Sequence, residues 1–411
     1  MTHVLAQSVE ILTTVLTLAC MGYFIAALVA SWTYLAARRA PLTLWSPGVT
    51  ILKSLKGLDP SMLDAFRSHC RQIYAGRYEL LFGISSLGDP AAAAVLELQK
   101  EFPDHAIRLI ECPATLGANG KVSTLVQLAK HASHEYLLIN DSDITVTPHY
   151  LERVMSHFAP TAGAPGLAPE TWEIRELAQT EVGLVTTLYR GRAQPTLPSR
   201  LESLGIATDF QAGVLLSRMI EGGLHYGLGS TLAVSRAALA KIGGLETLVD
   251  HLADDYELGA RIDKAGYRIA LSAEVVETAV PAYTWSGFVD HQIRWARTVR
   301  DARPWGYAGL IFTHGLAWAI LNVLASGLSP LSLWLLALNF FLRLSLAMNV
   351  GAIVLSDHQV LPNVWLLPLR DLVAMGIWVF GFAGHTIVWR GQHFELKNGK
   401  LHRMPSAKTA S

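Results

Sequence analysis

The strongest constraint on this fold is the stretch from Ile11 to Ala37, which contains no charged residue. A helix of that length is enough to cross the hydrocarbon core of a bilayer. Arg38 and Arg39 follow at once, and basic residues favour the cytoplasmic side, so the pattern predicts an anchor with its carboxyl end in the cytoplasm. We disfavour a cleaved signal peptide, because the run is too long, the residues before it are not basic and no A-x-A-like site follows.

The composition supports a membrane protein, with 51% hydrophobic residues and a mean hydropathy of +0.32. Two later apolar regions, Pro304 to Leu342 with a break at Ser329 and Pro330, and Leu372 to Trp389, predict two or three further membrane helices. The expected domains are an anchor over 1–40, a cytoplasmic domain over 41–303, transmembrane helices over 304–390 and a basic tail over 391–411.

The number of spans conflicts with the charge pattern. Three C-terminal spans would place the basic tail outside, against the positive-inside tendency. The stretch with Pro362, Pro368, Arg370 and Asp371 is therefore expected not to span simply, because an intramembrane Arg-Asp pair normally faces protein or water. It is equally a candidate for lining the entrance of a binding site.

Charge and cysteine content exclude other classes. The 33 basic and 33 acidic residues balance, so bulk charge does not indicate a nucleic-acid partner. Cys20, Cys70 and Cys112 are far apart and form no C-x-x-C pair, which argues against a disulfide framework and a zinc site.

The middle of the chain alternates short β-rich runs with helix-like segments. The runs are Val49 to Leu55, Tyr78 to Ile84, Ala106 to Cys112 and Tyr136 to Asn140, and the helical segments are Asp59 to Tyr74, Pro90 to Phe102 and Lys121 to His131. This order predicts an α/β domain with a mainly parallel sheet covered on both faces. Ligands of such sheets bind beyond the carboxyl ends of the strands.

Polar residues follow all four of these strands. They are Lys53 and Lys56, then Asp89, then Asn119 and Lys121, then Asp141 and Asp143. Asp89 taken alone is more typical of a turn or a helix cap. The convergence of several charges on one edge favours a binding site.

Asp141 and Asp143 are separated by one serine directly after an apolar strand. Because side chains alternate along an extended segment, both carboxylates point to the same side. Hard oxygen ligands of this kind suit Mg²⁺ or Mn²⁺, which commonly bridge carboxylates to substrate phosphates. The pair is therefore a candidate metal site.

Asp254 and Asp255 precede a helical stretch that ends near Gly266. Carboxylates favour helix starts, so a helix-capping pair is one interpretation. The other is a general base that takes a proton from an attacking hydroxyl.

Arg294, Arg297, Arg300 and Arg303 recur every third residue just before the second apolar region. We expect the last two or three of these to anchor the chain at lipid headgroups. Arg294, with His291 before it and Trp295 after it, is instead expected at a diphosphate.

Several segments together resemble the ceramide glucosyltransferase family, which is family 21 of the glycosyltransferases, including bacterial hopanoid-associated members. They are "LKGLDP", "YELLFGISSLGDPAAAAV", "GANGKVSTL", "LLINDSDITV", "GLGSTLAVSRAALAKIGG", "ADDYELGARI" and "HQIRWART", and the end of the chain from Leu367 to Leu396 is similar as well. The resemblance implies a GT-A-type fold, inverting transfer from a UDP-sugar to a lipid hydroxyl, and Mn²⁺ or Mg²⁺ as cofactor.

The resemblance also assigns roles to residues. Asp255 matches the base, Asp141 with Asp143 the metal and diphosphate site, and Asp89 a nucleotide contact. Lys56, Lys121 and the pair Arg294 and Trp295 are expected to bind the nucleotide sugar. His291 stands where the family usually has Gln or Arg, so its contact with the diphosphate departs from the pattern. Asp143 stands where animal members tend to have Gly, which favours metal dependence.

The substrates stay open at this point. The namesake reaction moves glucose from UDP-glucose to ceramide, and the alternative moves N-acetylglucosamine or another sugar to a hopanoid polyol or diacylglycerol. A processive polysaccharide synthase and a catalytically silent lipid-binding scaffold are the rivals from other classes. We expect a bacterial inner-membrane enzyme with its catalytic domain in the cytoplasm.

Two further features of the sequence carry weaker expectations. The Pro/Gly-rich segment 159–181 is interpreted as an insertion without an assigned function. His225, Tyr226 and Trp285 are candidate pocket walls, although a core or turn role is more usual for such residues.

Overall fold

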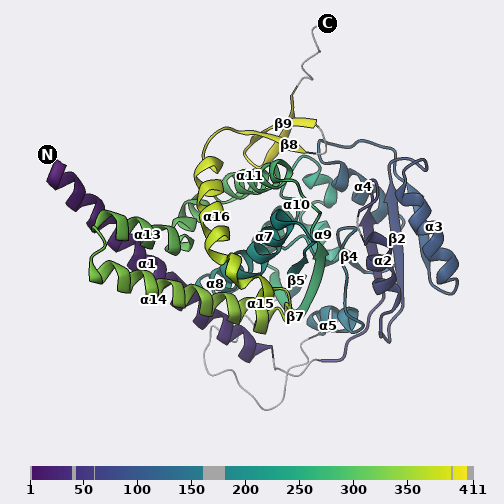
Figure 1. Cartoon of the computed structure of the whole chain (residues 1–411). Coiled ribbons are helices and arrows are strands. Elements are labelled where there is room, and N and C mark those ends of the chain that lie inside the picture. Colours follow the sequence, from purple (N-terminus) through teal and green to yellow (C-terminus); the bar gives the residue numbers. More distant parts are fainter. Residues whose placement is uncertain (1, 39–42, 60, 161–180, 390–391, 405–411) are drawn as a thin grey trace, which may run out of the picture.

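The computed structural model describes residues 2–38, 43–59, 61–160, 181–389 and 392–404 (Figure 1). Arg39 and nearly all of the Pro/Gly-rich insertion, residues 161–180, lie outside these ranges.

The centre of the molecule is a seven-stranded sheet in the order β3-β2-β1-β4-β6-β5-β7. Its strands are β1 (Val49–Ser54), β2 (Tyr78–Ile84), β3 (Ile107–Glu111), β4 (Tyr136–Ile139), β5 (Val182–Arg192), β6 (Leu232–Ser235) and β7 (Arg268–Ala279). Strands β3, β2, β1 and β4 run parallel, β6 is antiparallel to both neighbours, and β5 and β7 are parallel to each other. The predicted α/β class with a mainly parallel sheet is confirmed.

Helices cover the sheet because its strands are buried on both faces, as crossover connections require. The helices of this domain are α2 (Met62–Cys70), α3 (Ala91–Glu101), α4 (Gly120–Ala129), α5 (Tyr150–Met155), α7 (Leu197–Gly205), α8 (Gln211–Ile220), α9 (Arg236–Lys241), α10 (Asp254–Lys264) and α11 (Trp285–Ala302). A π-helical turn, η2 (Ile206–Phe210), joins α7 to α8.

The long helix α1 (Thr2–Ala37) has two different halves. Its second half buries Phe24, Ala27, Ala30 and Tyr34 in the same apolar cluster as the sheet. Its first half projects from the domain with exposed Val and Leu side chains, beside α13 (Gly315–Ala325) and α14 (Pro330–Ala347) (Figure 1). The amide of Asn322 near the end of α13 donates to Thr14 at 2.5 Å. Because solvent-exposed apolar helices of this kind are unfavourable in water, the projecting bundle is the part suited to a bilayer.

Three helices of the described chain are long and apolar enough to cross a membrane: Val4–Ala37, Pro330–Val354 and Val360–Gly381. A bent pair, Pro304–Thr313 with Gly315–Ala325, passes the same test together. The sequence predicted an anchor and two or three further membrane helices, and these three helices with the bent pair agree with that prediction.

The end of the chain differs from expectation. The last apolar helix, α16 (Leu367–Gly381), stops before the apolar run does, and β8 (Thr386–Trp389) follows it. With β9 (Gln392–Lys397) and β10 (Lys400–Arg403) it forms a three-stranded antiparallel sheet where a basic tail was expected. The physical reason is the Asn398-Gly399 turn, both residues having positive φ, which closes a β-hairpin between alternating apolar residues.

Charged residues of the apolar region are buried in the protein. Arg343 of α14 lies 2.8 Å from Asp371 of α16 and also pairs with Asp209 of η2, whereas Arg370 lies 3.4 Å from Asp209. The expected Arg370-Asp371 pair therefore faces protein, but each member is paired with a residue of another element. These ion pairs tie the apolar helices to the catalytic-side turn η2.

Candidate active site

Three charged groups meet where β4 ends and α4 and α10 begin. Lys121 Nζ lies 2.7 Å from Asp141 Oδ1 and 3.4 Å from Asp254 Oδ2. Burial alone would lower the pKa of Lys121, but the charges of Asp141 and Asp254 outweigh it and raise that pKa. Lys121 is thus a fixed cation at the edge where the sequence predicted converging charges.

Asp143, two residues after Asp141, is held in place by hydrogen bonds. Its Oδ2 accepts from Thr278 Oγ1 at 2.5 Å and from the Ala279 amide at 3.1 Å. Burial, with the charge of Asp141, raises the pKa of Asp143. Lys53 donates to the Asp141 carbonyl at 3.0 Å, and burial lowers the pKa of Lys53 to about 7 against the opposing charge of Asp143.

Asp255 lies in the first turn of α10, half-buried against the loop before β6. A Cβ added to Gly229 would approach its Oδ2 to 2.9 Å, so the carboxylate packs closely on this glycine. The amino-terminal cap of α10 is Ala253, and neither Asp254 nor Asp255 occupies the capping position. Both carboxylates nevertheless lie in the first turn of α10, where the helix dipole favours negative charge, so the helix-start interpretation holds although neither residue is the cap itself.

The electrostatics of Asp255 suit a base. Burial, reinforced by the adjacent charge of Asp254, raises the pKa of Asp255 to about 6, although Lys121 opposes the shift. A carboxylate with such a pKa is ionised near neutral pH and still accepts a proton readily.

Asp89 has a local structural role. Its Oδ1 accepts from the amides of Gly57 and Ala91, each at 2.9 Å. It therefore joins the loop after β1 to the start of α3, as a turn residue does. Asp89 does not line the cleft described below.

The residues expected to close the site form a separate cluster on α11. His291 Nδ1 lies 3.1 Å from Glu202 of α7, and its ring lies 5.3 Å from that of Tyr283 and 5.1 Å from that of Trp295. Trp295 in turn lies 6.4 Å from Phe210 of η2.

Tyr283 connects this cluster to the strand-end carboxylates. Burial raises the pKa of Tyr283; Glu202 and Asp143 add to the shift and Arg294 opposes it. Arg294 and Asp143 thus shift the pKa of the same phenol in opposite directions.

The remaining arginines of the stripe bind protein, contrary to the expected anchoring at headgroups. Arg297 donates to the carbonyls of Ala383 and Thr386, and Arg300 to those of Gly381 and Gly384. Arg303 pairs with Glu221 at 2.6 Å. The reason is that the chain after α16 turns back over α11 and presents its carbonyls to these guanidinium groups.

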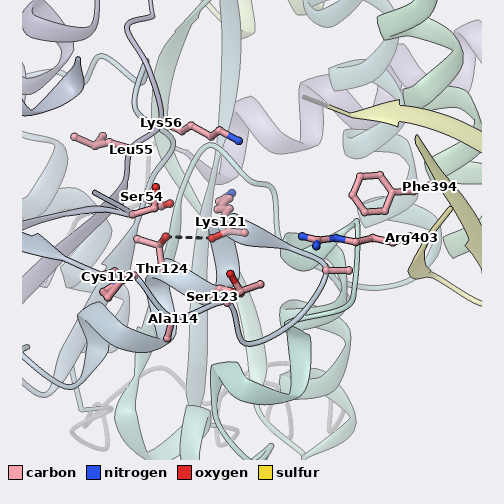
Figure 2. Close-up of a pocket in the computed structure, with 15 residues that line it drawn as sticks. Ser54, Leu55, Lys56, Cys112, Ala114, Lys121, Ser123, Thr124, Phe394 and Arg403 are labelled. Carbon is pink, nitrogen blue, oxygen red and sulfur yellow. Dashed lines mark hydrogen bonds between the residues drawn. The ribbon is translucent and has the colours of Figure 1, made fainter. Parts of the chain in front are cut away.

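A cleft of about 200 Å³ opens beside this rim (Figure 2). The ends of β1 and β3, the start of α4 and the C-terminal sheet line it. Lys56 and Lys121 face it, as do Phe394 and Arg403 of the C-terminal sheet. It has the polar and apolar lining and the place beyond parallel strands that ligand sites in such sheets have.

The carboxylates at the strand ends are of the type that a divalent metal uses. No group of three or more His, Cys, Asp or Glu side chains is arranged for a metal within the described ranges. Two carboxylates are nevertheless enough for Mg²⁺ or Mn²⁺, which complete their coordination with water and substrate phosphates. Asp141, which remains half exposed and already holds the ammonium of Lys121, offers such an oxygen donor at the rim.

The candidate wall residues lie elsewhere. His225 pairs with Asp263 at 3.0 Å, Tyr226 stacks on Tyr256 with ring centroids 5.8 Å apart, and Trp285 packs edge-on to Phe288. None of the three lines the cleft.

Sequence reasoning missed Glu202, Thr278, Tyr283, Phe394 and Arg403. The first three carry no motif that sets them apart. The last two were within reach, because the Asn-Gly pair at 398 and 399 between alternating apolar residues is the strongest short-range hairpin signal.

Comparisons with known proteins show the family of the chain. The profile of Glycosyl transferase family 21 matches residues 12–168 and 173–402. The chain is 24% identical over 368 residues to Ceramide glucosyltransferase 3 of Caenorhabditis elegans, across 86% of this chain and 73% of the relative. It is 22% identical over 367 residues to Ceramide glucosyltransferase 1 of that organism, across 86% of this chain and 72% of the relative.

Among solved structures, the fold is similar to that of the mannosyltransferase PcManGT from Pyrobaculum calidifontis in complex with GDP-Man and Mn²⁺. The TM-score is 0.50 at 18% identity, over 91% of this chain and 99% of that one. At this identity the likeness shows the fold alone, which is of the GT-A type.

Proposed function

The chain belongs to glycosyltransferase family 21, and on that premise we propose that it is a membrane-bound inverting enzyme that moves one sugar from a UDP-sugar to a lipid hydroxyl. The observation that carries the proposal is the position of Asp255. Its half-buried carboxylate, of raised pKa, lies beside the Lys121, Asp141 and Asp254 cluster. The domain is attached to apolar helices on both sides, which suits an acceptor that stays in the bilayer.

The reaction is a direct displacement. The lipid hydroxyl oxygen attacks the anomeric carbon as the bond from that carbon to the diphosphate oxygen breaks, and the hydroxyl proton goes to Asp255. UDP leaves with the electron pair of the broken bond. Lys121 and Arg294 offset the negative charge of the leaving group, and attack from the face opposite to it inverts the anomeric configuration.

Asp141 and Asp143 would hold a divalent cation, which when bound would neutralise charge on the diphosphate. Asp143 is kept in place by Thr278 and by the Ala279 amide, so its orientation does not depend on the ligand.

An aromatic series runs from this centre toward the apolar helices. Tyr189 is half-buried near the site carboxylates, and desolvation with the charge of Asp255 raises its pKa. Its ring lies 5.7 Å from that of Phe210, and the Phe210 ring in turn neighbours that of Trp295. Asp209, in the same turn as Phe210, pairs with Arg343 of α14. We propose that the acceptor approaches Asp255 along this series.

For the substrates we propose UDP-glucose and ceramide, because the relatives carry the name ceramide glucosyltransferase. We place the domain on the cytoplasmic face of a bacterial inner membrane, following Arg38 at the end of α1.

The test is mass spectrometry of lipid products. Purified protein in detergent receives Mn²⁺, a panel of UDP-sugars, and ceramide, hopanoid polyol and diacylglycerol as acceptors. A single hexosyl-ceramide product is expected. An N-acetylhexosaminyl-hopanoid product would replace the substrate assignment, sugar ladders would establish a processive synthase, and no product from any pair would refute the enzyme.

A further inference from the structure

The C-terminal sheet presents one face to the catalytic domain. In its register Phe394 is opposite Arg403 and Leu396 is opposite Leu401. Because side chains alternate along each strand, these four lie on one face. Phe394, Leu396 and Leu401 are buried there with Ile387 and with Leu252 of the catalytic domain.

This face is fixed to the two loops that carry the site. The Leu401 amide donates to the Asp250 carbonyl at 2.8 Å, and the Leu252 amide donates to the Gly399 carbonyl at 3.2 Å. Leu252 is three residues before Asp255. Ala118, three residues before Lys121, packs on the same apolar cluster. The sheet therefore bridges the loop before α10 and the loop before α4.

Arg403 lies on the same face of the sheet as the apolar residues, at the end of β10, and lines the cleft. In Figure 2 its guanidinium points across the cleft toward Lys121, with Lys56 on the far side. Three cations from three separate parts of the chain thus surround about 200 Å³. The start of α4 at Gly120 adds backbone amides and the positive end of a helix dipole.

We propose that Arg403 binds the phosphates of the nucleoside diphosphate donor, so that the C-terminal sheet forms one wall of the donor site. This inference rests on the proposed function and extends it to a part of the chain beyond the apolar helices. Guanidinium groups bind phosphate oxygens in a bidentate manner, whereas an ammonium group provides a point charge.

The experiment measures UDP and uridine binding by calorimetry on the full chain in detergent with Mg²⁺. The variants are Arg403→Gln, which removes the charge, and Arg403→Lys, which keeps it without the fork. The matched control is His402→Ala, because His402 is exposed on the opposite face of β10. Thermal unfolding without nucleotide verifies that each variant keeps the fold.

We expect Arg403→Gln to weaken UDP binding by about tenfold or more, since a hydrogen bond to a charged group is lost. Arg403→Lys should lose less, and both should bind uridine as the wild type does. His402→Ala should match the wild type with both ligands.

Unchanged UDP affinity in Arg403→Gln would overturn the proposal, as would an equal loss for UDP and uridine. If the wild type itself binds no nucleotide, the failure lies with the proposed function instead. If Arg403→Gln does not fold, the UDP affinity of Arg403→Lys decides alone, and an unchanged value overturns the assignment.

Discussion

Asp255 is the residue on which the proposed chemistry depends. Asp255→Asn keeps the shape of the side chain but removes the group that accepts the proton. We expect kcat to fall by at least about 100-fold, the usual contribution of a general base, with UDP affinity nearly unchanged. The control is Asp263→Asn on the same helix, where the carboxylate pairs with His225 far along α10. Full turnover in Asp255→Asn would refute its role.

The raised pKa of the same carboxyl group predicts a pH profile. A base acts only when it is ionised, so kcat/KM should fall as the pH is lowered through about 6. The sign follows from burial, which raises the pKa of Asp255 above the ordinary carboxyl range and so extends the protonated form toward neutral pH. A kcat/KM that stays constant down to pH 5 would contradict this prediction.

At the scale of elements, α10 approaches the loop before β6 without space for a side chain. A Cβ added to Gly259 would lie 2.1 Å from the Gly227 amide nitrogen and 2.4 Å from the Tyr226 carbonyl carbon. Gly259→Ala should displace α10 and so lower activity. It should also lower the free energy of unfolding by about 1–3 kcal/mol, because this packing cost exceeds the gain of up to about 1 kcal/mol in helix propensity. Gly223→Ala, with nothing within 4 Å, is the control. If Gly259→Ala had the same melting temperature and activity as Gly223→Ala, the prediction would be contradicted.

The buried ion pairs make a second prediction at this scale. Arg343→Met leaves Asp209 and Asp371 without their shared partner and should cost about 3–5 kcal/mol in thermal unfolding. Arg343→Met combined with Asp371→Leu removes one of the stranded charges and leaves Asp209 beside Arg370. The double variant should therefore melt above the single one. A lower melting temperature for the double variant would show that the pairing is not what holds α14 to α16.

For the whole molecule, the docked C-terminal sheet limits which membrane topologies are possible. Its contacts with Asp250 and Leu252 require the chain to return to the catalytic side after α16. The start of α14 lies at the projecting end of α1, and the Arg38 side chain donates to Val354 at the other end. We infer that the bent pair of Pro304–Thr313 with α13 crosses out and that α14 crosses back. We further infer that α16 lies at the interface, because it runs crosswise to α13 and α14 in Figure 1, although the segment Val360–Gly381 that contains it is long enough to span.

Labelling in sealed vesicles tests this topology. Single cysteines replacing exposed Lys397 of β9 and Lys100 of α3 should react with an impermeant maleimide from the same side. A cysteine replacing exposed Leu328, between α13 and α14, should react only from the other side. Labelling of the first two positions from opposite sides would mean that α16 crosses the membrane.

The sequence alone determined the first four strands, the carboxylates that follow them and the apolar helices. These features are local: alternation, helical period and an uncharged run are read within about 5–25 neighbouring residues. Asp255 and Arg294 were already candidates from the residues alone, and the family resemblance assigned their roles, because several spaced segments matched together.

Only the tertiary structure decided the partners. Asp371 pairs with Arg343 and not with its neighbour Arg370, Asp89 holds the Gly57 amide, and Arg403 reaches a cleft formed by residues 54–124. Such contacts join residues tens to hundreds of positions apart, and they depend on how closely packed elements fit one another. Local pattern fixes which face of an element is buried, whereas packing selects what lies against it.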